Sequence, residues 1–227
     1  MAYIEMVHSF KRYHMGDITI TANNDVSFGI ERGELAIILG SSGAGKSTVL
    51  NILSGMDTNS EGKVIIDGSD VTNLPEHKRA AFIGRVFQDP MMGTAPSMWI
   101  EENLALAARR GQRRGLSWGV TKEEKEQYRE LLGGLGLGLE SRLTTKVSTL
   151  SGGQRQALTL LMATLKRPKL LLLDEHTAAL DPKTAAKVME LTDRIVREGQ
   201  LTTLMITHNM RCLLYTSPSP RDTERSR

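Results

Sequence analysis

The sequence predicts an α/β fold with a mainly parallel sheet, an N-terminal antiparallel group of strands and an inserted helical subdomain. Apolar runs typical of buried strands cover residues 35–39, 169–174 and 202–207, and helical patterns separate them. Residues 91–147 change from strand-like to helical patterns before strand-like runs resume, which predicts the insertion at about residues 91–150.

Composition limits the classes of function. The chain has 227 residues, of which 40% are apolar and 24% are charged, as in a soluble protein with one large domain or one domain carrying an insertion. A net charge of +3 and an aromatic content of 4% are too low to indicate nucleic-acid binding, so we expect no nucleic-acid partner. The single cysteine, Cys212, excludes an internal disulfide.

No membrane-spanning segment is predicted. No apolar run approaches the roughly 20 residues that cross a bilayer, and residues 1–10 lack the apolar region of a signal peptide. We therefore expect the chain to stay in the cytosol, and any membrane role to need a separate membrane subunit.

Short strands are expected around the first core strand, separated by turn signals at Met15-Gly16-Asp17 and Asn23-Asn24-Asp25. Tyr13, before the first of these turns, is interpreted either as a half-buried tyrosine or as a ring that stacks on adenine. The expected short strands cover residues 3–7, 18–21, 26–30, 63–67 and 84–88.

The stretch after the first core strand reads GSSGAGKS, a G-x-x-x-x-G-K-S pattern with Gly40, Gly45, Lys46 and Ser47 at its fixed positions. Glycines let the backbone curl so that N–H groups point at phosphate oxygens, and the following helix presents its positive end to them. Lys46 can reach the β- and γ-phosphates, and the Ser47 hydroxyl can ligate Mg²⁺. The chain is therefore expected to bind a nucleoside triphosphate on a P-loop NTPase core.

Polar residues at the ends of later strands complete the predicted site. Asp174 ends the run KLLLLD and is expected to hold Mg²⁺, directly or through water, while Glu175 can polarise an attacking water. Gln88 is interpreted as a polar strand end or as a residue near Mg²⁺. A lone histidine is more often structural, but His208, just past the last core strand, also fits contact with a γ-phosphate.

A second glycine-rich turn, LSGGQ at residues 150–154, precedes a helix expected at 155–166. Ser151 is a natural N-cap, and the glycines expose backbone N–H groups at the helix start. Since one nucleotide cannot readily use both surfaces of one chain, we expect two chains packed head to tail. The LSGGQ of one chain would then lie over the Lys46 loop of the other.

The predicted insertion carries helices at residues 100–109 and 122–132, followed by a glycine-rich hinge or helix end at 133–138. Residues 109–114 read RRGQRR and are interpreted as a solvated loop, with contact to anionic lipid headgroups or a partner as the alternative. After the Asp-Glu pair, a tight turn at residues 179–182 precedes another expected helix, at 183–197.

Taken together, these motifs resemble the ATP-binding cassette (ABC) family over residues 3 to about 211. LSGGQ between the two phosphate-site motifs is specific to this family and excludes the kinase and GTPase branches. The resemblance implies a Walker A loop of Gly40, Ser41, Ser42, Gly43, Ala44, Gly45, Lys46, Ser47 and Thr48, a Q-loop at Gln88, a signature of Ser151, Gly152, Gly153 and Gln154 acting in trans, a Walker B of Asp174 with catalytic Glu175, a D-loop at Asp181, a switch at His208 and an adenine-stacking Tyr13.

The resemblance implies an ATP-hydrolysing subunit that works at the cytoplasmic face of the cell membrane. ATP and Mg²⁺ are the implied cofactors, with Mg²⁺ held by Ser47, Gln88 and Asp174. A second cassette, as a homodimer, and transmembrane permease subunits are the implied partners. Soluble cassette proteins of translation or DNA repair usually carry two fused cassettes or a long coiled coil, and this sequence contains neither.

Two finer resemblances disagree about the direction of transport. Residues 16–68 resemble cassettes of lipoprotein release and macrolide export, whereas residues 84–190 resemble cassettes of tryptophan/tyrosine-type uptake systems. The chain is interpreted either as a chimera of two cassettes joined near residues 61–68 or as one divergent natural cassette. The longer match favours amino-acid-type uptake, with export or lipoprotein release as the alternative.

The C-terminal stretch CLLYTSPSPRD, residues 212–222, is similar to the in-frame translation of a sequencing adapter. We interpret residues 212–227 as a non-native tail on a cassette, residues 1–211, that lacks its last elements. The open sheet edge left behind predicts poor solubility, which purification of a monodisperse protein would contradict.

Overall fold

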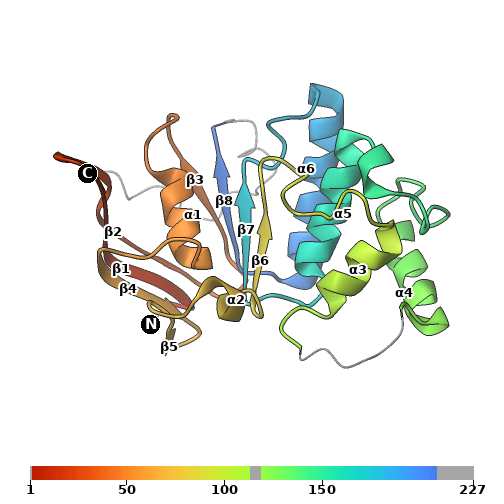
Figure 1. Cartoon of the computed structure of the whole chain (residues 1–227), viewed down its shortest axis with the longest axis horizontal. Helices are drawn as coiled ribbons and strands as arrows, with labels where there is room; N and C mark the ends of the chain where they lie inside the picture. The colour runs from red at the N-terminus through yellow and green to blue at the C-terminus, as the bar shows by residue number, and fades with distance from the viewer. Residues whose placement is uncertain (1, 113–118, 209–227) are drawn as a thin grey trace.

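The structure is a computed structural model that describes residues 2–112 and 119–208. Within these residues the chain forms two four-stranded sheets flanked by helices, which confirms the predicted α/β class (Figure 1). The elements are β1 (Ile4–Met15), β2 (Ile18–Ile30), β3 (Leu35–Leu39), α1 (Lys46–Ser54), β4 (Glu61–Ile66), β5 (Ser69–Asp70), α2 (Glu76–Arg79), β6 (Ile83–Val86), α3 (Ile100–Ala108), α4 (Lys122–Gly133), the short 3₁₀ helix η1 (Val147–Thr149), α5 (Gly152–Thr164), β7 (Leu170–Asp174), α6 (Pro182–Gly199) and β8 (Thr203–Thr207).

The core sheet is parallel, in the order β3-β8-β7-β6. Leu170 and Leu172 of β7 join the buried cluster that contains α1 and the antiparallel sheet, whereas Leu171 and Leu173 join the cluster of α3 to α6. Successive side chains of a strand point to opposite faces, so β7 supplies both cores. Burial on both faces explains why this strand reads as a continuous apolar run.

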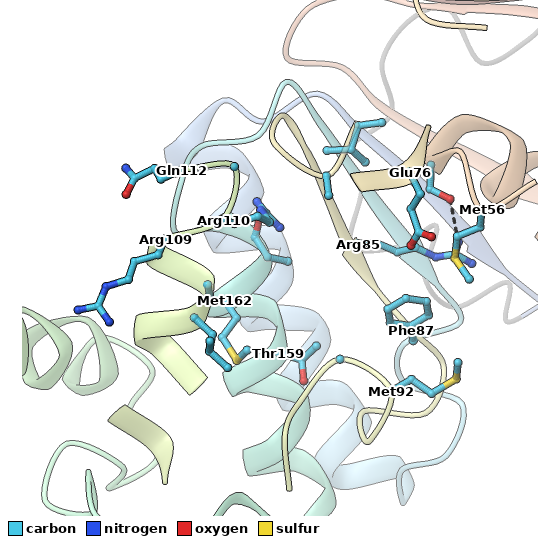
Figure 2. A pocket seen from close by; sticks show the side chains of 18 residues that line it. Met56, Glu76, Arg85, Phe87, Met92, Arg109, Arg110, Gln112, Thr159 and Met162 are labelled. Atoms are coloured by element: carbon cyan, nitrogen blue, oxygen red, sulfur yellow. Dashed lines mark hydrogen bonds between the residues drawn. The ribbon is translucent and has the colours of Figure 1, made fainter. Parts of the chain in front are cut away.

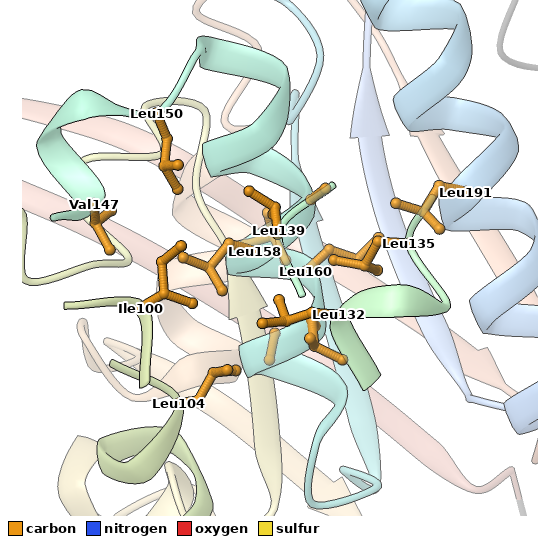
Figure 3. Packing of buried hydrophobic residues seen from close by; sticks show 14 of the residues in the cluster. Ile100, Leu104, Leu132, Leu135, Leu139, Val147, Leu150, Leu158, Leu160 and Leu191 are labelled. Carbon is orange, nitrogen blue, oxygen red and sulfur yellow. The ribbon is translucent and has the colours of Figure 1, made fainter. Parts of the chain in front are cut away.

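The helices after β6 pack together on the α5 and α6 side of the parallel sheet (Figures 1 and 3). Ile100 and Leu104 of α3 and Leu132 of α4 meet Leu158 and Leu160 of α5 in one buried cluster. α3 and α4 lie where the sequence predicts helices, and their apolar faces are buried against α5, the helix that begins in LSGGQ.

The N-terminal strands are longer than predicted. β1 and β2 form one antiparallel hairpin of 12 and 13 residues, in place of three short strands. The turn at Gly16 is confirmed, but the turn predicted at residues 23–25 is wrong, because these residues lie within β2. The ladder with β1 continues past them through register shifts, and Asp25 takes a left-handed conformation with φ 55°.

Two predicted boundaries also shift. β6 ends at Val86, so Gln88 lies in the loop after the strand. α5 begins at Gly152 rather than at residue 155, because Ser151 and Gln154 form a capping box that starts the helix three residues earlier. The predictions for residues 113 and 114 of the basic stretch, and for residues 212–227, lie outside the described residues.

A buried arginine fastens α1 to the segment between β5 and β6. The Arg79 guanidinium donates to the carbonyl oxygens of Ile52 and Leu53 at the end of α1, at 2.6 and 2.9 Å. It also donates to Leu74 and Thr72, each at 2.8 Å. One cation thus satisfies carbonyl oxygens both at the end of α1 and in the segment before α2.

Replacing Arg79 by Leu should lower the free energy of unfolding by about 3 kcal/mol, because the buried carbonyls lose a charged donor. Chemical denaturation of the purified protein measures this loss. The exposed neighbouring Lys78→Leu is the matched control and should change it by no more than about 0.5 kcal/mol. Equal effects of the two substitutions would contradict the fastening role of Arg79.

Candidate functional site

The loop between β3 and α1 forms the first part of the site. The Lys46 Nζ donates to the carbonyl oxygens of Gly40 and Ser41, each at 2.8 Å, so the lysine folds over its own loop. Gly45 precedes the helix with φ 82°, and a Cβ there would lie 2.4 Å from the carbonyl oxygen of Ala22. Glycine is required at this position by both backbone conformation and space.

Ser47 and Thr48 occupy the first turn of α1, directly after Lys46. The loop residues before them, Ser41 to Ala44, are exposed. The predicted phosphate-loop residues therefore lie together at the N-terminus of α1, where backbone N–H groups and the helix dipole favour an anion.

Asp174 and Glu175 lie at the carboxyl end of β7, and His208 lies just past β8, the adjacent parallel strand. The structure brings two of these residues into contact, because His208 Nδ1 is 3.0 Å from Glu175 Oε2. Glu175 takes a left-handed conformation with φ 43°, and its N–H donates to Ile206 of β8 at 3.0 Å. The two residues predicted to act in hydrolysis thus form one hydrogen-bonded pair.

Asp174 has a partner that the sequence analysis missed. Arg85 of β6 lies with its Nη2 3.3 Å from Asp174 Oδ2, and the two side chains are 10% and 13% exposed. Burial raises the pKa of Asp174, and the Arg85 charge opposes that rise. An arginine inside a short apolar strand such as IGRV is a signal for a buried carboxylate partner, since buried charges are almost always paired.

The predicted Mg²⁺ ligands suit that ion. Ser47, Gln88 and Asp174 offer a hydroxyl, an amide and a carboxylate oxygen, and Mg²⁺ binds hard oxygen donors of this kind together with substrate phosphates. Gln88 is exposed, in the loop after β6 next to β7. Among the described residues, no group of three or more His, Cys, Asp or Glu side chains is arranged so that it could hold a metal ion.

Tyr13 lies near the end of β1, 37% exposed. Its hydroxyl donates to Asp57, and this hydrogen bond is the main cause of the raised pKa of Tyr13. The Lys11 ammonium lies 4.9 Å from the ring centroid, over one face of the ring. A stacking partner such as adenine would therefore use the other face, and this role remains a prediction.

The LSGGQ turn starts α5. Ser151 caps the helix, with the Gln154 N–H 3.3 Å from its Oγ. A Cβ on Gly153 would lie 2.3 Å from Thr184 Cγ2, so this glycine allows close packing against the first turn of α6. Asp181 caps α6, accepting from the Thr184 N–H at 3.1 Å. The LSGGQ turn and the Asp181 turn are thus in direct contact through Thr184.

α1 and α5 lie on opposite sides of the parallel sheet (Figure 1). The phosphate loop and the LSGGQ turn begin these two helices, so they are also separated by the sheet. This arrangement agrees with the expectation that one nucleotide cannot readily use both surfaces of one chain.

A groove of about 500 Å³ lies between the end of β6 and the helical side of the molecule (Figure 2). Its walls include Arg85 and Phe87 from the β6 side and Met162 and Thr159 from α5, with Met92 at one rim. Arg109 and Arg110 border it but bind within the chain: Arg109 to Glu124 at 3.0 Å, and Arg110 to the Ala163 carbonyl at 3.3 Å. These two members of the basic stretch are therefore engaged internally.

The comparison with known protein families agrees with this geometry. The family model described as ABC transporter matches residues 23–178. The chain belongs to the ABC transporter family. Proteins of this family carry ATP-binding cassettes that hydrolyse ATP, so the chain is an ATPase cassette.

This cassette is 51% identical over 191 residues to the tyrosine transport ATP-binding protein of Clostridioides difficile. The aligned residues cover 84% of this chain and 76% of that protein. It is 38% identical over 213 residues to the methionine import ATP-binding protein MetN 2 of Enterococcus faecalis, covering 92% of this chain and 59% of that protein. The cassette thus spans less than two thirds of the methionine relative.

Solved structures support the same assignment. A dimeric ATP-binding cassette in a post-hydrolysis state, bound to ADP and Pi, matches with a TM-score of 0.79 and 32% identity over 93% of this chain and 90% of that chain. A nucleotide-free cassette from an ABC transporter matches with a TM-score of 0.76 and 26% identity over 94% and 84%. Across the described part of this cassette, no helix is both long and apolar enough to cross a membrane.

His176, directly after Glu175, is a second residue that the sequence analysis missed. Its Nε2 lies 3.0 Å from Thr192 Oγ1 of α6, and Thr192 itself donates to the Val188 carbonyl at 2.8 Å. Because a hydroxyl has one proton, His176 Nε2 must be the donor. The side chain is buried, which lowers the pKa of His176 to about 4. No feature of the sequence separates it from a surface histidine.

The buried, neutral His176 should make stability depend on pH. Its folded pKa lies below the unfolded value of 6.5, so the unfolded chain binds the extra proton first as the pH falls. The contribution is complete above about pH 6.5 and should decline by about 2 kcal/mol towards pH 5. The free energy of unfolding, measured by urea denaturation in the presence of a chelator at about pH 7 and at about pH 5, gives the decline.

The His176→Asn variant should lose this part of the pH dependence, whereas the exposed His77→Asn variant should keep it. If all three proteins lost stability equally between the two pH values, His176 would not be the buried neutral group inferred here.

Proposed function

We propose that this cassette works as one of two copies that close head to tail around ATP and drive amino-acid-type uptake through separate membrane permease subunits. The observation that carries the proposal is the hydrogen-bonded pair of His208 and Glu175 beside Asp174. A histidine, a water-activating carboxylate and a metal-binding carboxylate at adjacent strand ends suit hydrolysis of a phosphoanhydride.

Each predicted residue has a role in this proposal. Lys46 and the N–H groups of residues 40–48 hold the phosphates, and Tyr13 stacks on the adenine. Ser47, Gln88 and Asp174 would hold Mg²⁺, which would neutralise the charge on the phosphates. The remaining roles belong to Glu175, which orients the attacking water, His208, which contacts the γ-phosphate, Asp181, which adjoins the dimer interface, and Ser151, Gly152, Gly153 and Gln154, which complete the site of the other copy.

The electrostatic logic of these roles follows from the structure. Lys46 donates to the carbonyls of Gly40 and Ser41, which are weak acceptors compared with phosphate oxygens. Phosphate oxygens can therefore compete with the loop carbonyls for the ammonium. A charged donor beside the phosphates stabilises the charge on the transferring phosphoryl group.

The uptake part of the proposal rests on names of relatives, a tyrosine transport and a methionine import ATP-binding protein. For the permease contact we propose the groove beside β6. Its methionines, among them Met92 and Met162, are flexible apolar side chains suited to an adaptable interface. An occupant would lie beside Phe87, next to Gln88 in the sequence, and so near the proposed metal site. Residues 91–150 would act as the helical subdomain that leads into the LSGGQ turn.

Replacing Glu175 by Gln should lower the ATPase rate at least about a hundredfold, because the amide cannot accept a proton from water. ATP binding should persist, and size-exclusion chromatography with ATP should show a stable dimer. The exposed Glu198→Gln is the matched control and should turn over at the original rate. Undiminished hydrolysis by the Glu175 variant would remove Glu175 from its role.

The transport function is tested by reconstituting the cassette in liposomes with the permease encoded beside its gene. Radiolabelled tyrosine and methionine should accumulate only with ATP and with an intact Glu175. ATP-driven movement of a lipid or lipoprotein out of the membrane, without amino-acid accumulation, would contradict the uptake proposal and favour the export alternative.

A further inference from the structure

Arg85 connects three parts of the molecule that the proposed function uses. It comes from β6, and its guanidinium lies between the end of α1 and the carboxylate of Asp174 on β7. The Nη2 atom is 2.8 Å from Asn51 Oδ1 and 3.3 Å from Asp174 Oδ2. Asn51 is four residues after Ser47 on α1, on the same face of the helix. The guanidinium thus contacts the proposed Mg²⁺ ligand Asp174 and the helix that carries Ser47.

The guanidinium is held in place by further contacts (Figure 2). Nη1 donates to Ser54 Oγ at 3.0 Å and to Met56 Sδ at 2.9 Å, and the guanidinium carbon lies 4.7 Å from the centroid of the Phe87 ring. A planar guanidinium can satisfy these partners together, which the single ammonium of lysine cannot do. Arg85 is therefore positioned at Asp174 by its surroundings and not by that ion pair alone.

Two cations near one carboxylate repel each other, and the repulsion is strong where the side chains are largely buried. The Arg85 charge compensates the largely buried carboxylate of Asp174. A divalent ion that binds Asp174 must overcome the repulsion of the guanidinium or displace it. The contact that compensates Asp174 within the chain therefore opposes binding of the metal.

We propose that Arg85 is a positioning residue that holds Asp174 before the metal arrives and competes with Mg²⁺ for it, and so sets the Mg²⁺ concentration needed for tight ATP binding. This inference rests on the proposed role of Asp174 as a Mg²⁺ ligand. Among the described residues, the ion pair of Asp174 is the one with Arg85. Lys46 is nearby, but its Nζ donates to the carbonyls of its own loop.

The test measures ATP binding by calorimetry at a series of free Mg²⁺ concentrations, from a chelator to saturation. In chelator, the Arg85→Met variant should bind ATP with an affinity within about twofold of that of the unaltered protein. The Mg²⁺ concentration that gives half of the full gain in ATP affinity should be about tenfold lower in the variant. An unchanged or higher Mg²⁺ requirement would overturn the proposal. A purely structural role would weaken ATP binding equally at every Mg²⁺ concentration.

Arg85→Lys keeps the charge and loses the planar fork, so the Mg²⁺ requirement should fall by a smaller factor than in Arg85→Met. If circular dichroism shows that Arg85→Met does not fold, Arg85→Lys decides the question. An unchanged Mg²⁺ requirement in Arg85→Lys would then overturn the proposal. Arg110→Met is the matched control, because Arg110 borders the same groove and binds a carbonyl instead of Asp174. An equal fall in Arg110→Met would also overturn the proposal, since any lost charge would then suffice.

Asp174→Asn separates this inference from the proposed function. The substitution should raise the Mg²⁺ requirement, and adding Arg85→Met to it should then change nothing further. If Asp174→Asn leaves the requirement unchanged, the proposed ligand role of Asp174 fails, and the inference fails with it. If Asp174→Asn raises the requirement but Arg85→Met does not lower it, the inference alone fails.

Discussion

The parallel pairing of β3, β8, β7 and β6 is the constraint on which the proposed site depends, because it brings the carboxyl ends of the four strands to a common edge. The leucines of β7 enforce this pairing, since a slip by one residue would exchange the side chains of the two cores. The contact of 3.0 Å between His208 and Glu175 is a direct result of it. The groups at this edge are Lys46 after β3, His208 after β8, Asp174 and Glu175 at β7 and Gln88 after β6.

Two cations at this edge have partners within the chain. Lys46 donates to the carbonyl oxygens of its own loop and Arg85 pairs with Asp174, so both charges are compensated by internal contacts. Binding of ATP would exchange these internal contacts for contacts to phosphate and metal. The free energy of these lost internal contacts would then help to set the difference in affinity between the Mg²⁺–ATP complex and either ATP or Mg²⁺ alone.

The LSGGQ turn depends on a different set of contacts. Close packing of Gly153 against Thr184 joins the start of α5 to the start of α6, where Asp181 forms the cap. Both turns follow from short-range capping, yet their contact places the two family motifs side by side. Since the parallel sheet separates them from the phosphate loop of the same chain, the proposed function needs a second copy, as in the solved dimeric cassette with ADP and Pi.

The sequence by itself determined the elements whose causes are local: the glycine spacing before Lys46, the cap at Ser151 and the apolar run of β7 act through near neighbours. It misplaced a turn at residues 23–25, because pairing with β1 overrides a local turn signal. Only the tertiary structure decided that Arg85 meets Asp174, 89 residues away, and that His208 meets Glu175, 33 residues away. Those contacts depend on strand order, which no local pattern encodes.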